Sequence, residues 1–365
     1  MRRGRVATDF IPLHCHSSHS VGFFLIRDLV KKVKGLGYPG LALVDTDLFG
    51  MVEFFKICQN QGLKPILGAE LNGLLIIVKD RKGYENLSSI ITEYHRTGTI
   101  TPKEGLIYLS QSEHRLESLS KKTPLHDLFQ IIPPYRRPGR FPPIAVPEIN
   151  CQDQEVFPVF LKIKGLKGEP GPVPARDQIL NSYHPEAVRN TVRIFNSVNF
   201  TLEPKRSFPR FSGDLLSLLR GKSKNRREQL RLEYELKLIR GYGCESLFLI
   251  VYQIFSFARN QGIMVQVRGS GVASLILHKL GLSVVNPLDL GLPFERFLNP
   301  KRDDPPDIDL DVDYRYRDLL IQRLIRIVGP DHAARPAVIN RFHLPGAFRA
   351  VALVLGIPSD ELKRS

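Results

Sequence analysis

The sequence is poor in cysteine and lacks any apolar run of membrane-spanning length. Four cysteines occur among its 365 residues, none in the Cys-x-x-Cys spacing of zinc knuckles and redox motifs. Sparse, scattered cysteines are typical of a reducing compartment, so we expect a cytoplasmic protein. The apolar stretch 247–251 is far too short to cross a membrane, and no apolar segment follows the basic N-terminus. We therefore expect neither a membrane protein nor a secretory signal.

Acidic residues are also scarce relative to basic ones. The chain contains 52 Lys and Arg against 37 Asp and Glu, a formal net charge of +15. This excess predicts a polyanionic partner, with nucleic acid favoured over a membrane surface. The hydrophobic fraction of 42% and the charged fraction of 24% are those of an ordinary globular protein with room for two domains.

In the first half of the chain, strand-like and helix-like segments alternate. This alternation favours a parallel sheet, either open or closed into a barrel. A Pro- and Arg-rich segment at 203–213 is typical of a domain junction, and it divides the chain into expected domains 1–205 and 206–365. The predicted strands are residues 10–14, 41–44, 65–67 and 74–78, and the predicted helices are residues 25–36 and 51–58.

The second half contains a run in which aspartate alternates with aliphatic residues. Read as a strand, residues 307–313 place Ile308, Leu310 and Val312 in a core and four carboxylates on the opposite face. A row of like charges requires a cation, and divalent metals with their bound phosphates are the usual candidates. A solvated acidic turn or a calcium loop is the alternative, but the aliphatic residues count against a turn. The carboxylates are Asp307, Asp309, Asp311 and Asp313.

A glycine-containing turn precedes this aspartate strand. Residues 264–267 predict a strand and 272–280 predict a helix, with Arg268, Gly269 and Ser270 between them. Ser270 is a suitable helix N-cap, glycines allow backbone N–H groups to approach an anion, and Arg268 adds a charged phosphate contact. Alone, this is more often an ordinary strand-to-helix turn. Combined with the aspartate strand, it predicts nucleotidyl transfer, with metals on the carboxylates and a triphosphate on the turn.

Near the N-terminus, His14 and His16 lie on one face of a predicted strand, as metal sites require. Asp45 and Glu70 each follow a buried strand, so four potential ligands lie at strand ends. A lone His-x-His pair, however, is more often structural than ligating.

Residues 210–365 resemble the N-terminal palm segment of the bacterial replicative polymerase alpha subunit, the C family of DNA polymerases. The resemblance implies that Asp307 and Asp309 bind catalytic Mg²⁺ and that Gly269 and Ser270 hold nucleotide phosphates. It implies no role for Asp311 or Asp313. The matching stretches are residues 248–251, 257–263, 268–270, 293–302 and 306–311.

The first half resembles the PHP (polymerase and histidinol phosphatase) domain that precedes the palm in the same family. Of the family's metal ligands, His14, His16, Asp45 and Glu70 are retained, whereas Thr46, Gly73 and Asn150 stand where the family has ligands. We therefore expect a structural PHP domain and no Zn²⁺ or Mn²⁺ at this site. The matching stretches are residues 13–17, 41–45, 49–54 and 64–70.

These resemblances imply an α/β chain in which a PHP-type (β/α) barrel precedes a partial nucleotidyltransferase-like α+β palm. The implied function is template-directed DNA synthesis in replication or repair, with DNA and replisome subunits as partners. We expect the family's third carboxylate, thumb and fingers to lie beyond Ser365, so that a second polypeptide would be needed for activity. Pro345 and Gly346 are also expected to break a family helix.

Two alternatives remain open. One is a polymerase-derived protein without activity that binds DNA or acts as a scaffold. The other is a metal-dependent PHP phosphoesterase or 3′–5′ exonuclease.

Overall fold

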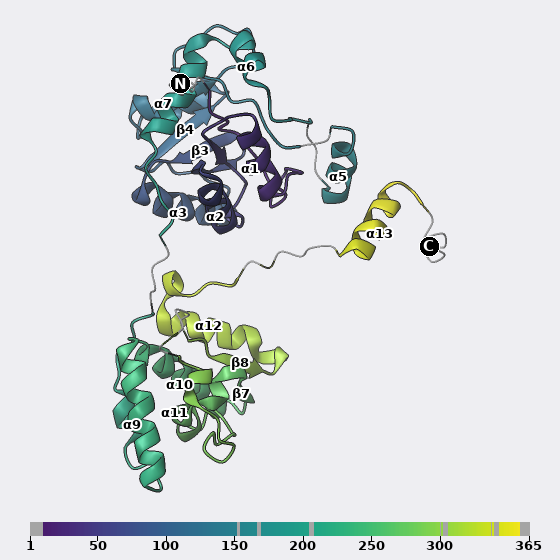
Figure 1. The fold of residues 1–365 in the computed structure, drawn as a ribbon. Coiled ribbons are helices and arrows are strands. Elements are labelled where there is room, and N and C mark those ends of the chain that lie inside the picture. Colours follow the sequence, from purple (N-terminus) through teal and green to yellow (C-terminus); the bar gives the residue numbers. More distant parts are fainter. Residues whose placement is uncertain are drawn as a thin grey trace, which may run out of the picture. The chain divides into compact units, whose positions relative to one another are not determined.

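The computed structural model describes residues 10–151, 154–165, 169–203, 208–299, 301, 306–336, 338 and 343–357. The chain forms two compact units (Figure 1). The first unit contains Met1–Glu203 and Ile339–Ser365, and the second contains Pro204–Val338. The expected domain boundary between residues 205 and 206 lies outside the described residues.

Within the described part of the first unit, six strands form one sheet in sequence order. β1 pairs with β2 in parallel, and β4, β5 and β6 are likewise parallel to one another. β3 runs antiparallel to both β2 and β4. The strands are β1 (Gly40–Leu43), β2 (Lys64–Leu71), β3 (Leu74–Val78), β4 (Leu106–Ser110), β5 (Leu128–Ile131) and β6 (Pro143–Ile144).

The reversal at β3 corrects the prediction of a parallel sheet. Only Asn72 and Gly73 separate β2 from β3, and both have positive φ angles, 51° and 72°. A two-residue loop with this backbone forms a tight hairpin, whereas parallel strands require a crossover connection of a dozen or more residues. The strand positions at 65–67 and 74–78 were predicted correctly, but the hairpin turn between them was missed.

Residues 10–14, predicted as a strand, do not form one, but Cys15 directly after them joins the two sides of this sheet. Cys15 forms parallel bridges to Leu43 of β1 and to Ile149, five residues after β6. The His16 amide donates to the Ile149 carbonyl and the Ile149 amide donates to the His14 carbonyl, both at 2.8 Å. The sheet is therefore curled, with its first strand linked through Cys15 to the segment that follows its last.

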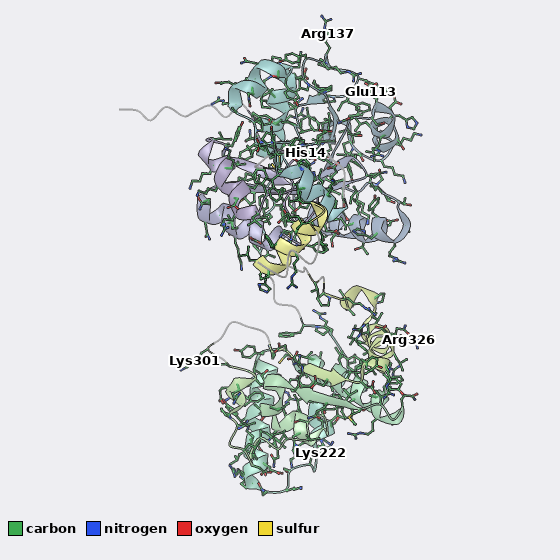
Figure 2. All side chains as sticks on the ribbon, turned by 90° about the vertical axis from the view of Figure 1, so that its right-hand side faces the viewer. His14, Glu113, Arg137, Lys222, Lys301 and Arg326 are labelled. Carbon is green, nitrogen blue, oxygen red and sulfur yellow. The ribbon has the colours of Figure 1, made fainter. Side chains whose placement is uncertain are left out.

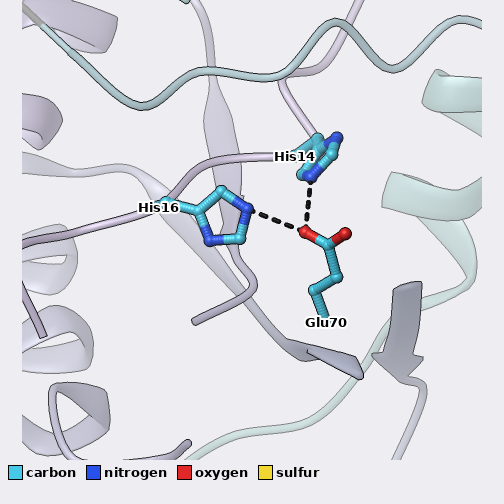
Figure 3. Close-up of side chains that lie close together, drawn as sticks. All are labelled: His14, His16 and Glu70. Atoms are coloured by element: carbon cyan, nitrogen blue, oxygen red, sulfur yellow. Dashed lines mark hydrogen bonds and ion pairs between the residues drawn. The ribbon is translucent and has the colours of Figure 1, made fainter. Parts of the chain in front are cut away.

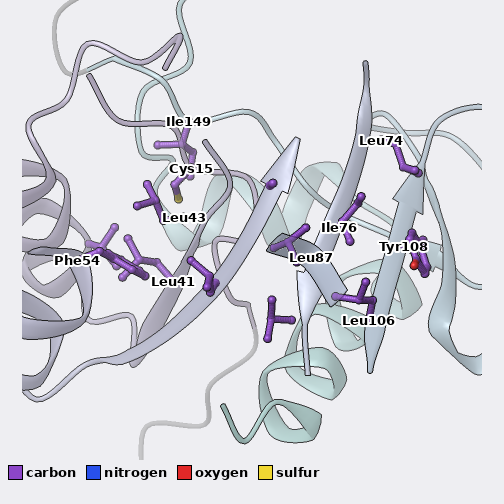
Figure 4. Packing of buried hydrophobic residues seen from close by; sticks show 14 of the residues in the cluster. Cys15, Leu41, Leu43, Phe54, Leu74, Ile76, Leu87, Leu106, Tyr108 and Ile149 are labelled. Atoms are coloured by element: carbon purple, nitrogen blue, oxygen red, sulfur yellow. The ribbon is translucent and has the colours of Figure 1, made fainter. Parts of the chain in front are cut away.

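Both faces of the curled sheet are buried. Along β3 and β4 the side chains alternate between two clusters: Leu75, Ile77 and Ile107 pack with residues of α7, and Ile76 and Tyr108 pack on the other face (Figure 4). Strands buried on both faces appear as continuous apolar runs, as here. The helices of this unit are α1 (Ile26–Gly35), α2 (Met51–Gln61), α3 (Arg81–Thr97), α4 (Glu113–Ser120), η1 (Leu125–Asp127), α5 (Phe157–Lys164), α6 (Arg176–Ser182), α7 (Pro185–Ser197) and α13 (Leu344–Val354).

α13 corrects one prediction. Pro345 and Gly346 lie in its first turn and do not interrupt it. Proline is tolerated there because the first backbone N–H groups of a helix have no intrahelical acceptor.

The second unit is mostly helical, with one two-stranded antiparallel sheet in its described part. The strands are β7 (Val265–Arg268) and β8 (Asp309–Val312). The helices are α8 (Leu215–Leu219), α9 (Arg226–Gly241), α10 (Glu245–Asn260), η2 (Gly269–Ala273), α11 (Leu275–Lys279), η3 (Phe294–Arg296), η4 (Tyr314–Tyr316), α12 (Arg317–Val328) and η5 (Pro330–His332).

β8 follows the predicted alternation. Leu310 and Val312 pack in a cluster with residues of α10 and α12, whereas Asp309 and Asp311 are exposed. The apolar side chains thus anchor the strand and leave its carboxylates facing solvent.

The helix predicted at 272–280 is shorter than expected and is capped by a different residue. Residues Gly269–Ala273 form a 3₁₀ turn, and α11 begins only after Ser274, whose hydroxyl accepts the Leu277 amide proton. The prediction that Ser270 caps this helix is therefore wrong.

A buried carboxylate occupies the N-terminus of α11. Glu235 accepts hydrogen bonds from the Leu275 and Ile276 amides and the Ser274 hydroxyl, at 2.8–3.1 Å. Arg231 pairs with the same carboxylate at 2.7 Å. Because Glu235 accepts hydrogen bonds from the first backbone N–H groups of α11, these groups are not available to a phosphate.

No helix in the described part of the chain is long and apolar enough to cross a membrane.

The β2–β3 hairpin gives a stability prediction. Gly73→Ala should lower the free energy of unfolding by about 1 kcal/mol, because alanine is strained at positive φ. No other atom lies within 4 Å of the position of the added Cβ, so steric overlap does not contribute. Urea unfolding followed by circular dichroism measures the change.

Gly35→Ala is the matched control. It also adds a methyl group into open space, but within α1. It should stabilise the protein slightly, by about 0.5–1 kcal/mol. Equal effects of the two substitutions would contradict the proposed role of the turn.

Candidate metal-binding and nucleotide-binding sites

Two imidazoles and one carboxylate meet in the first unit (Figure 3). The Nε2 atoms of His14 and His16 lie 3.0 Å and 2.9 Å from the same Glu70 oxygen, Oε2. One potential ligand atom from each residue falls within 4.8 Å of the others. Imidazole nitrogen and carboxylate oxygen are the donors of zinc sites and of other transition-metal sites. The predicted pair His14 and His16 is thus brought together with Glu70.

Local backbone geometry positions these three side chains. His14 and His16 flank Cys15, whose own side chain is fully buried in the core. Residues two apart on an extended segment share a face, so both imidazoles point away from that core. Glu70 lies near the end of β2, and its amide donates to the Val44 carbonyl at 3.1 Å.

Glu70 is ionised, as a carboxylate that binds a cation must be. Burial raises the pKa of the Glu70 carboxyl, but hydrogen bonds from His14 and His16 outweigh burial and hold the pKa well below its usual range. The carboxylate therefore stays charged at neutral pH.

Asp45, the fourth predicted ligand, is not part of this group. Its carboxylate accepts the Ser17 amide at 2.7 Å and the hydroxyls of Ser17 and Ser20. It lies 3.9 Å from Nδ1 of His16, on the side of the ring opposite Glu70. Asp45 thus lies behind His16 without a hydrogen bond to it, and is held by Ser17 and Ser20.

The substituted positions have structural roles of their own. Asn150 donates to the Glu148 carboxylate at 2.8 Å and accepts the Gly171 amide at 2.7 Å. Gly73 forms the hairpin turn. Glu148, which was not among the predicted site residues, borders the same cavities as Glu70.

The three-residue group opens into two cavities. A cleft of about 910 Å³ is lined in part by His14 and Glu70, and a smaller cavity of about 270 Å³ is lined in part by His16, Glu70 and Asn150. The group is thus accessible from solvent. Other residues that line the larger cleft are Ser110, Glu113, Arg115, Gln130, Arg136, Arg137, Glu148 and Tyr183.

In the second unit, the glycine turn and the aspartate strand come together. Arg268 is the register partner of Asp309 in the β7–β8 pair. Gly269, at φ 65°, lies so close that an added Cβ would be 3.2 Å from Oδ2 of Asp309. Asp307 and Asp309 are both exposed, and Ser270 is half-buried. One predicted carboxylate therefore lies directly against the predicted phosphate turn.

Arg268 is paired within this site. Its Nε lies 3.1 Å from Oδ1 of Asp311, one of the two aspartates without an expected role. Asp313 pairs with Arg315, which together with the Arg315 amide holds the pKa of the Asp313 carboxyl below its usual value. Asp311 and Asp313 thus each form an ion pair with an arginine.

Comparison with known proteins agrees with this two-part organisation. Residues 12–144 match the model of the PHP domain, and residues 209–365 match that of the bacterial DNA polymerase III alpha NTPase domain. The chain thus combines a PHP domain with the NTPase region of bacterial DNA polymerase III alpha. The expected fold class is confirmed as a curled mixed α/β sheet followed by a mostly helical palm-region domain.

Nearly the whole chain is similar in sequence to bacterial DNA polymerases. The error-prone DNA polymerase of Cutibacterium acnes is 29% identical over 95% of this chain and 39% of its own length. DNA polymerase III subunit alpha of Escherichia coli K12 is 27% identical over 96% of this chain and 38% of its own length. The chain thus spans about 40% of the length of these relatives.

The three-residue group gives a metal-binding prediction. The purified chain should take up one Co²⁺ per molecule, with Glu70→Gln weakening the affinity by tenfold or more, because a neutral amide replaces an ionised ligand. Visible absorbance of bound Co²⁺ during titration measures both quantities.

Glu113→Gln is the control, since Glu113 lines the same cleft but is not part of the group. It should leave Co²⁺ binding unchanged. Failure of the wild-type chain to bind Co²⁺, or equal affinities of wild type and Glu70→Gln, would refute the site.

Proposed function

We propose that this chain supplies the nucleotide- and metal-binding part of a DNA polymerase III alpha-type enzyme. In this proposal, Asp307 and Asp309 hold Mg²⁺, and Arg268, Gly269 and Ser270 bind the triphosphate of the incoming nucleotide. The observation that carries the proposal is the closeness of Gly269 to the Asp309 carboxylate, which would lie 3.2 Å from a Cβ added at Gly269. A metal held by Asp309 would lie within reach of a phosphate on the turn.

The chemistry of the residues supports this assignment. When bound, Mg²⁺ would activate the attacking hydroxyl and offset charge on the leaving pyrophosphate. The backbone at Gly269 can approach a phosphate closely because it has no Cβ. Arg268 can contact a phosphate once its pairing with Asp311 is exchanged for the ligand, since both side chains are more than half exposed.

The proposal places DNA synthesis in an assembled enzyme. By its family resemblance, the catalytic centre needs a third carboxylate from a part of the polymerase beyond residues 1–365. That part would be supplied by further sequence or by a second polypeptide, with DNA and replisome subunits as partners. The site of action we propose is the cytoplasm.

A second candidate function belongs to the first unit. The grouping of His14, His16 and Glu70 beside a large cleft favours binding of one metal ion and, with it, phosphoesterase or 3′–5′ exonuclease activity. Three donors suit a single ion, whereas a trinuclear centre would need more ligands than this group offers.

Asp309→Asn tests the first proposal. In the full chain, the substitution should weaken Mn²⁺-dependent dATP binding by tenfold or more, because it removes a charged ligand next to the phosphate turn. Asp311→Asn should strengthen dATP binding, because it frees Arg268. Isothermal titration with and without Mn²⁺ measures both effects.

Asp289→Asn is the control, since Asp289 is an exposed acid of the same unit outside β8. It should not change binding. If the wild type and Asp309→Asn bind dATP equally, the nucleotide site is wrong, and a DNA-binding or scaffolding role without catalysis becomes the better reading. A primer-extension assay, with the remaining polymerase segments supplied from a relative, then asks whether Asp307→Ala abolishes incorporation.

A further inference from the structure

A basic, aromatic loop borders the larger cleft of the first unit. Residues 133–140 read Pro-Pro-Tyr-Arg-Arg-Pro-Gly-Arg, and most of them line the same cleft as His14 and Glu70. Figure 2 shows Arg137 projecting from the surface of this unit. Neither the metal group nor the nucleotide site of the second unit uses this loop.

Two cations of the loop are available to a ligand. Arg136 and Arg137 are exposed, and within the described part of the chain their guanidinium groups have no ion-pair partner. Other cations nearby are engaged: Arg140 pairs with Glu117 at 2.6 Å, and Arg115 donates to the Asn72 carbonyl at 2.6 Å.

The acids of the cleft also have partners. Glu70 accepts from the two imidazoles, Glu113 accepts the Arg140 amide at 3.2 Å, and Glu148 accepts from Asn150. These hydrogen bonds order Glu113 and Glu148 without cancelling their charge, so the unpaired positive charge belongs to the loop itself, at Arg136 and Arg137. This arrangement favours an anionic ligand that enters over the loop.

Tyr135 adds an exposed aromatic ring beside these arginines. Its side chain is 82% exposed, and its backbone has an unusual positive φ of 60°. The Tyr135 amide donates to the Ser182 carbonyl at 2.7 Å, and its hydroxyl lies 3.3 Å from Oγ of Ser182. These contacts to α6 hold the backbone while the ring face stays open.

We propose that this loop binds a single-stranded nucleic acid, with Arg136 and Arg137 on successive phosphates and a base stacked on Tyr135. An aromatic ring beside basic residues at a groove is the arrangement by which proteins bind single strands without sequence preference. A strand on the loop would run along the cleft toward His14 and Glu70. The proposal concerns the first unit and does not depend on nucleotidyl transfer in the second.

The test uses the full chain and fluorescein-labelled dT16, with binding followed by fluorescence anisotropy at several salt concentrations. The double variant Arg136→Ala/Arg137→Ala should raise Kd about tenfold or more. A plot of the logarithm of the association constant against the logarithm of salt concentration has a negative slope. Its magnitude should fall by about 1.4, because each lost phosphate contact to a single strand removes about 0.7.

The matched control is Arg96→Ala/Arg189→Ala, which removes the same charge from exposed positions on α3 and α7 outside the cleft. It should change neither Kd nor the slope appreciably. If both double variants weaken binding equally, the effect is one of net charge and the proposal is overturned.

Tyr135→Ala and Tyr135→Phe test stacking separately from charge. The alanine variant should bind dT16 at least about fivefold more weakly, whereas phenylalanine retains the ring and should bind as the wild type does. A 16-base-pair duplex should show no dependence on Tyr135, since its bases are already stacked. Equal losses for both tyrosine variants would overturn the stacking role.

A U16 arm distinguishes an RNA strand from a DNA strand, since both offer the same phosphates and base faces. Weaker binding of the loop variants to either strand supports the site. The strand whose Kd changes more identifies whether the ligand is RNA or DNA. Binding to both strands that is indifferent to all the loop substitutions would refute the proposal, whether or not the second unit binds nucleotide.

Discussion

Both candidate sites depend on the alternation of side chains along an extended backbone. At the N-terminal segment, Cys15 is buried in the core, and the residues on either side of it face the opposite way. At β8, Leu310 and Val312 are anchored in a cluster while Asp309 and Asp311 face solvent. In each case, burial of every second residue forces the polar side chains between them onto one face. The ligand groups are therefore positioned by hydrophobic packing on the far side of the same segment.

Charge compensation inside the fold is the second common feature. Glu70 is held by two imidazoles, Glu235 by Arg231 and the start of α11, and Asp311 by Arg268. The Glu235 contacts are buried, so they define permanent structure. The Arg268–Asp311 pair is more than half exposed, where an ion pair is weak and can exchange for a ligand. Burial thus makes the Glu235 contacts structural, whereas the exposed Arg268–Asp311 pair can exchange for a ligand.

Several features were predictable from local sequence because local rules govern them. The apolar periodicity of α1 and the alternation in β8 arise from burial of one face, and the continuous apolar run of β3 arises from burial of both faces. The pairing of His14 with His16 follows from the same rule. By contrast, the cap of α11 was assigned to Ser270 instead of Ser274, because both serines suit the role and only the packing of Glu235 distinguishes them.

The sequence by itself determined the resemblance of each half to a known domain, and the faces on which the histidines and aspartates lie, since these depend on residue order along single segments. Only the tertiary structure decided which of those groups meet. It brought Glu70 to the two imidazoles and left Asp45 behind them, and it placed Gly269 against Asp309. Such contacts join residues far apart in the chain. Their geometry depends on strand pairing and sheet curvature, which no local pattern specifies.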